Sequence, residues 1–208
     1  MNFQRIIDFL PGVLIGLTVH EFFHAFAAYK LGDNTARDQG RLTFNPIKHI
    51  DLIGLLFIIF AGFGWAKPVQ FNPENLQNVR RDKAIIAAAG PLSNFILGIL
   101  FCFILKAMSA YYSVNDIEPA LSIIKLSHII QYAAFINFGL FIFNLLPIPP
   151  LDGSHIIFSG LNLSYDTEEK IRKIGLPVLF LIIIIQNQFG IPILPIGIAV
   201  NYLMGLFL

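Results

Sequence analysis

Residues 6–31 read IIDFLPGVLIGLTVHEFFHAFAAYKL, an apolar stretch that nevertheless contains His20, Glu21 and His24. About 20 mainly apolar residues suffice for a helix to cross a bilayer, so this stretch predicts a membrane span. Ionisable side chains inside such a span are costly and usually serve a function. Residues four positions apart share one face of a helix, so two imidazoles could hold a metal ion while Glu21 reaches a water on it. The HExxH pattern therefore predicts a zinc site inside a membrane helix.

The composition of the whole chain is also that of a membrane protein. Of its 208 residues, 56% are hydrophobic and only 13% are charged, too few to cover a soluble domain. A net charge of +1 gives no reason to expect nucleic acid as a partner. Cys102 is the single cysteine, so no intrachain disulfide can form. We predict one all-α polytopic membrane domain over residues 1–208, with about five to six transmembrane or partly inserted helices.

Three stretches are long and apolar enough to cross the bilayer, at residues 6–31, 84–108 and 126–146. A fourth, at 175–208, could make two passes that break near 186–195. Eight of the fourteen Lys and Arg residues lie between Lys30 and Lys83, whereas the loop at 111–120 has none. By the positive-inside rule, the basic region faces the cytoplasm and the loop faces outward. The predicted location is therefore the cell membrane, crossed several times.

The stretch 52–66 is apolar but shorter than a span, and basic residues flank it on both sides. If both flanks are cytoplasmic, the stretch must enter and leave the membrane on the same side, as a re-entrant hairpin or loop. Gly54, Gly62, Gly64 and Pro68 suit such a turn. Non-helical backbone at membrane depth needs a cover of protein or water, so we expect this stretch to line a cavity. The short apolar stretch 155–163 is expected to be partly inserted.

A catalytic zinc ion needs a third protein ligand and an open position for water. The residues after HExxH do not supply that ligand, because Ala27 and Lys30 stand where a metzincin has Gly and His. Most of the candidates elsewhere lie in charged loops, where a solvated or capping side chain is the ordinary role. The candidates are Asp33, Asp38, His49, Asp51, Asp152 and His155.

Asp152 differs from the other candidates because it follows NLLPIPPL at 144–151. The three prolines there must end the third span and leave an extended segment, and Gly153 then allows a sharp turn. The charge-derived topology puts this end of the span at a depth similar to that of His20 and His24. Asp152 is therefore the favoured third ligand, although an aspartate that only caps a helix at the interface fits the same sequence.

Five motifs, in this order, resemble the site-2 protease family of intramembrane zinc metalloproteases, peptidase family M50. They are HEFFHAFAAYKLGD at 20–33, GRLTFNPIKHID at 40–51, GWAKPVQFNP at 64–73, AGPLSN at 89–94 and NLLPIPPLDGSHI at 144–156. HExxH paired with NxxPxPxLDG is highly specific to that family. The loop at 111–120 is too short for a PDZ domain and no CBS pair is seen, so the resemblance is to a compact branch of the family.

The resemblance implies that His20, His24 and Asp152 hold one zinc ion and that Glu21 is the catalytic acid and base. It also implies active-site roles for Asn94 and Asn144. Their amides could orient the substrate or donate to an oxyanion, or instead satisfy the backbone of broken helices. By the same resemblance, 52–65 corresponds to the family's membrane-embedded β-hairpin or loop near the substrate. His155 suits a supporting position better than that of a fourth ligand.

The predicted function is hydrolysis of peptide bonds in or near the transmembrane segments of membrane proteins. The active site is expected within the bilayer toward the cytoplasm, with 1–156 as the catalytic core and 157–208 as accessory membrane segments. A helical substrate must unwind before it is cut, and residues 52–65 could then pair with it as a strand. Two alternatives are a protein that transports zinc through the same ligands and an inactive relative that acts as a scaffold. Glu21 between the two histidines favours the hydrolase. Nothing in the sequence selects one substrate or one oligomeric state.

Overall fold

The structure is a computed structural model that describes residues 3–61, 64–161, 163–190 and 192–208. Its secondary structure is helical, which confirms the predicted all-α class. The elements are α1 (Phe3–Lys30), α2 (Thr35–Asp38), α3 (Pro46–His49), α4 (Leu52–Ala61), the 3₁₀ helix η1 (Pro73–Asn75), α5 (Val79–Val114), α6 (Leu121–Asn144), α7 (Asp152–Gly160), α8 (Tyr165–Phe189) and α9 (Ile196–Phe207). No strand occurs in the described residues, and a single isolated bridge pairs Ile50 with Ala66.

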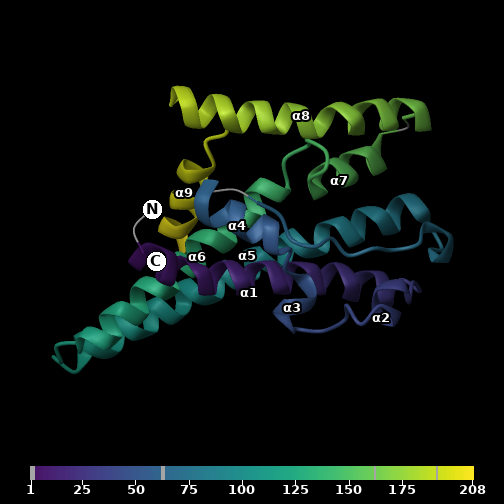
Figure 1. Ribbon diagram of the computed structural model, residues 1–208. Coiled ribbons are helices and arrows are strands. Elements are labelled where there is room, and N and C mark those ends of the chain that lie inside the picture. Colours follow the sequence, from purple (N-terminus) through teal and green to yellow (C-terminus); the bar gives the residue numbers. More distant parts are fainter. Residues whose placement is uncertain (1–2, 62–63, 162, 191) are drawn as a thin grey trace.

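Helices α1, α5 and α6 pack against one another and form the centre of the molecule (Figure 1). They are also the three described helices that are long and apolar enough to cross a membrane, and they coincide with the three predicted spans. Helix α9 covers α6, and the buried side chains of Cys102, Phe138 and Val200 meet in the core between α5, α6 and α9. Cys102 is therefore a small buried core residue.

The ends of the long helices follow from local chemistry. The Asn78 side chain accepts a hydrogen bond from Arg81 N and caps α5, and Ser164 caps α8 in the same way. Helix α6 ends at Asn144, just before the prolines that cannot continue it. Residues 145–151 form successive turns rather than the expected extended segment, because Leu146 N and Leu151 N each bond to a carbonyl three residues earlier. These turns reverse the chain, so that α7 packs against α5.

The stretch 52–66 differs from the expected hairpin or loop, because most of it is the helix α4. A helix satisfies its own backbone groups in an apolar setting, which an open loop cannot do. The Asp51 carboxylate starts this helix by accepting a hydrogen bond from Gly54 N. The bridge between Ile50 and Ala66 brings the two ends of the stretch together, as a segment that enters and leaves on one side requires. Gly62, one of the glycines expected to turn the chain, lies outside the described residues.

The C-terminal stretch breaks where the sequence predicts a break. Helix α8 ends at Phe189, Gly190 has a left-handed φ of 66°, and α9 begins at Ile196. Neither helix is among the described candidate spans. Helix α8 lies along the edge of the molecule beside α7, where Arg172 lies over the ring of Phe158 (Figure 1). The described C-terminal helices thus flank the three spans, and the site lies among α1, α5 and α7.

Candidate metal centre

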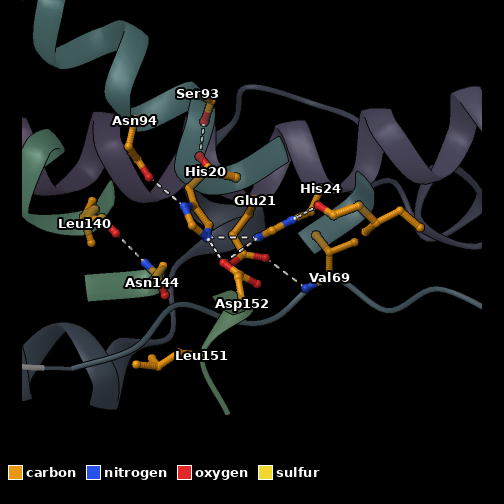
Figure 2. A network of polar contacts seen from close by, with 12 residues as sticks. His20, Glu21, His24, Val69, Ser93, Asn94, Leu140, Asn144, Leu151 and Asp152 are labelled. Carbon is orange, nitrogen blue, oxygen red and sulfur yellow. Dashed lines mark hydrogen bonds and ion pairs between the residues drawn. The ribbon is translucent and has the colours of Figure 1, made fainter. Parts of the chain in front are cut away.

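The HExxH residues lie in the C-terminal half of α1, and their three ionisable side chains are buried. His20, Glu21 and His24 expose only 5%, 7% and 8% of their surface, respectively. One helical turn separates the two imidazoles, whose Nε2 atoms are 3.0 Å apart (Figure 2). Two nitrogen ligands of the same kind therefore point at one position beside the helix.

Asp152, the first residue of α7, completes the group. Its Oδ2 atom is 3.1 Å from His20 Nε2 and 3.4 Å from His24 Nε2. Gly153 permits this placement, because a Cβ atom there would overlap the Leu145 carbonyl and force α7 away from the end of α6. The structure therefore brings together the three predicted ligands, and this is the one group of metal-ligand type found among the described residues.

Each histidine has a hydrogen bond on the nitrogen that faces away from the group. His24 Nδ1 is 2.7 Å from the carbonyl oxygen of Ile86, which can only accept, so this nitrogen carries the proton. His20 Nδ1 is 2.6 Å from Asn94 Oδ1. Such bonds fix the ring orientation and leave the Nε2 lone pair free, as metal-binding histidines require.

The donor set fits a zinc ion in chemistry and in size. Two imidazole nitrogens and one carboxylate oxygen are typical ligands of catalytic zinc, which bind at about 2.0–2.1 Å in tetrahedral geometry. Ligand atoms at that bond length lie about 3.3 Å apart along the edges of a tetrahedron. The three distances here, 3.0, 3.1 and 3.4 Å, are close to that value.

Glu21 lies beside this group in a cavity of about 380 Å³. Its Oε2 atom accepts a hydrogen bond of 2.9 Å from Val69 N, which fixes the carboxylate (Figure 2). Trp65, Ala66 and Val69 line the cavity together with the three metal-ligand candidates and Asn144. The segment 64–71, which follows α4, is thus one wall of the cavity, and its backbone holds the predicted acid and base in place.

The other candidates for the third ligand have different partners. Asp33 accepts hydrogen bonds from Thr35, Asn72 and Asn75. The remaining contacts are Asp38 with Arg37, His49 Nε2 with Thr43 O, Asp51 with Gly54 N and His155 Nδ1 with Arg172. His155 does line the cavity, and its burial, together with the Arg172 cation, lowers its pKa below the ordinary value. It lies beside the group but is not one of the three residues whose ligand atoms converge.

The two predicted asparagines occupy different positions. Asn94 is fully buried behind His20, and the cavity lining does not include it. Asn144 lines the cavity, and its amide donates to Leu140 O in its own helix. A third asparagine, Asn137, was not predicted from the sequence; its side chain is fully buried and bonded to Asn94. An amide inside the apolar stretch 126–146 was the signal that could have identified it.

The fold is a helix bundle with three helices that could cross a membrane. Its site combines the HExxH helix with an aspartate that is distant in the sequence. Together these features define a membrane protein with a metalloprotease-type site. The profile described as Peptidase family M50 matches residues 8–186, and the chain belongs to this family. The predicted family is therefore confirmed.

Relatives with curated names agree with this assignment. The chain is 44% identical over 145 residues to a Bacillus subtilis protein named as zinc metalloprotease YwhC, covering 70% of this chain and 65% of that protein. It is 31% identical over 158 residues to one named as zinc metalloprotease Rip2 in Mycolicibacterium smegmatis, covering 74% and 57%. The Rip2 protein of Mycobacterium tuberculosis H37Rv is 29% identical over 149 residues, covering 69% and 53%.

These names support zinc as the cofactor. The chain spans between 53% and 65% of the length of these relatives. No solved structure matched it.

Proposed function

We propose that the chain is a zinc-dependent endopeptidase that hydrolyses peptide bonds in or near the transmembrane segments of membrane proteins. The observation that carries this proposal is the convergence of His20 Nε2, His24 Nε2 and Asp152 Oδ2 beside Glu21 in one cavity. The names of the relatives support the same activity. Zinc bound to the three ligands would polarise the scissile carbonyl and supply a water nucleophile at neutral pH.

Residues of the chain would transfer the protons and position the substrate. Glu21 would take a proton from the attacking water and pass it to the leaving amine nitrogen, because its carboxylate lies next to the ligand group and is oriented by Val69 N. Asn144 is the amide on the cavity wall, so it is the better placed of the two asparagines to contact the substrate. Asn94 would instead orient the imidazole of His20 through its hydrogen bond with Nδ1.

The substrate segment would occupy the cavity between α1 and the segment 64–71. Because a helix hides its amides, the scissile bond must leave helical geometry to reach Glu21. The Lys and Arg distribution supports a site that opens toward the cytoplasm in a protein of the cell membrane. We further propose that residues 1–156 hold all the catalytic groups and that 157–208 are accessory.

The test uses Glu21→Gln, which removes the acid and base but keeps the size of the side chain. The purified variant, in liposomes with a transmembrane substrate, should cleave that substrate about 10²- to 10⁴-fold more slowly than the wild type, because acid–base catalysis usually contributes that much. It should still retain one zinc ion per chain. His24→Ala should lose both the zinc ion and the activity. Glu74→Gln, an exposed carboxylate on η1, is the matched control and should change neither.

Two outcomes separate the alternatives. A wild-type protein that moves zinc across the liposome membrane without cutting the substrate would indicate a transporter. A wild-type protein that binds zinc but neither cuts nor transports would indicate a scaffold. Cleavage that persists in Glu21→Gln would contradict the role proposed for Glu21.

A further inference from the structure

Three buried amide and imidazole side chains form a hydrogen-bonded chain that crosses all three spans. It begins at Asn137 on α6, passes through Asn94 on α5 and ends at His20 on α1. The links measure 2.9 Å from Asn94 Nδ2 to Asn137 Oδ1 and 2.6 Å from His20 Nδ1 to Asn94 Oδ1. Both asparagines are completely buried, so no solvent competes for these bonds.

The direction of every bond in the chain follows from two backbone carbonyls. Asn137 Nδ2 lies 2.8 Å from Ala133 O, and Asn94 Nδ2 lies 3.0 Å from Gly16 O. A carbonyl oxygen can only accept, so an NH₂ group must face each of them. Asn137 must then direct its oxygen toward Asn94, and Asn94 must direct its oxygen toward His20.

These bond directions also fix the tautomer of His20, a candidate metal ligand. An amide oxygen accepts a proton and cannot donate one, so His20 Nδ1 must carry the hydrogen and Nε2 must present its lone pair. If the Asn94 amide turned over, its NH₂ group would face Nδ1 and favour the tautomer with a proton on Nε2. That tautomer cannot bind a metal ion through Nε2.

Asn137 discourages this reversal. A turned Asn94 amide would set its oxygen against the Asn137 oxygen and the Gly16 carbonyl, leaving buried acceptors facing each other without a proton. We infer that Asn137 is a positioning residue that holds the amide of Asn94, and through it His20, in the form that binds the metal ion. This inference rests on the proposed role of His20 as a zinc ligand.

The experiment measures zinc affinity by competition with a chelator, on full-length protein in detergent. Asn137→Leu keeps the volume but removes the amide, and Asn137→Ser reaches Ala133 O but is too short to reach Asn94. Both should weaken zinc binding by about tenfold or more, the usual cost of losing such a partner. Asn137→Asp can restore both bonds as a neutral acid and should recover most of the affinity. Asn115→Leu is the matched control, because Asn115 also bonds to the carbonyl four residues earlier but is exposed and outside the chain of bonds.

A double-mutant cycle distinguishes positioning from a general packing role. In an Asn94→Leu background, Asn137→Leu should cause no further loss of zinc affinity if Asn137 acts only through Asn94. A second readout is the solvent-exchange rate of the His20 Nδ1 proton, followed by NMR of protein with ¹⁵N-labelled histidine. This rate should rise in Asn137→Ser.

The inference is overturned if Asn137→Ser folds and retains the wild-type zinc affinity and proton exchange rate, or if the two asparagine effects add. Failure of the zinc-ligand proposal is recognised separately. In that case His20→Ala would leave zinc affinity unchanged, whereas the proton exchange rate in Asn137→Ser would still report on the chain of bonds.

Discussion

The side chains at the centre of the molecule have little freedom to move. His20 and His24 are each held by a hydrogen bond on Nδ1, and Glu21 is held by the backbone of Val69. Preorganised groups of this kind need no rearrangement when a metal ion or a substrate arrives, which lowers the cost of binding and of reaction. The close approach of α5 to α1 depends on Gly90, which lies directly against both imidazoles.

A methyl group at Gly90 should displace the histidines. The Cβ atom in Gly90→Ala would overlap His24 Nε2 and lie 2.7 Å from His20 Nε2. We expect zinc affinity to fall by about tenfold or more, because the ligand geometry is lost, while the helical circular dichroism is retained. Gly205→Ala on α9 is the control, since nothing lies within 4 Å of its Cβ position. Unchanged zinc binding in Gly90→Ala would show that the imidazoles do not occupy the positions described.

Side chains that follow α1 hold in place the chain between α4 and α5. Asp33 accepts hydrogen bonds from Asn72 N and Asn75 Nδ2, and Arg41 donates to the carbonyl of Lys67. These contacts hold both ends of the cavity wall around Val69. Burial alone would raise the pKa of Asp33, but the hydrogen bonds from Thr35, Asn75 and Asn72 outweigh it and hold the pKa below its ordinary value.

Asp33→Asn should loosen this wall. An amide cannot accept all the hydrogen bonds of the carboxylate, so we expect the free energy of unfolding at pH 7 to fall by about 1–3 kcal/mol. Because the folded pKa is below the unfolded one, the stabilisation by Asp33 is present above about pH 4 and is lost as the pH falls through the folded pKa. The wild type should therefore approach the variant in stability as the solution is acidified. Asp38→Asn, an exposed carboxylate paired with Arg37, serves as the control. Equal stability of wild type and Asp33→Asn at pH 7 would contradict this account.

In the whole molecule, the cavity with the candidate metal ligands lies toward one end of the three central helices. The cavity and the segment 64–71 lie near the end of α1 that carries Lys30 and the start of α5, whereas the far ends of α5 and α6 meet at the loop 115–120 (Figure 1). Basic side chains concentrate around the first end. If the positive-inside rule applies, a substrate segment would meet the ligands near the cytoplasmic surface.

Cysteine labelling tests this orientation. In a Cys102→Ala background, a cysteine at the exposed position Glu118 should react with a membrane-impermeant maleimide added to intact cells. A cysteine at the exposed position Gln77, at the other end of α5, should react only after the membrane is permeabilised. The reason is that α5 separates the two positions and is long and apolar enough to cross the bilayer. The reverse pattern, or labelling of both positions from outside, would contradict the proposed topology.

The amino-acid sequence alone predicts the three apolar helices long enough to cross a membrane and the pairing of His20 with His24. Both depend on local properties, namely the length of an apolar run and the four-residue repeat of a helix. It also pointed to Asp152, through the prolines that end the preceding helix. The contact of Asn94 with His20, the hydrogen bond between Asn137 and Asn94, and the helical form of most of the stretch 52–66 emerge only from the folded chain. These features depend on which surfaces of separate helices meet, and on where buried polar groups find partners, and no local pattern encodes either.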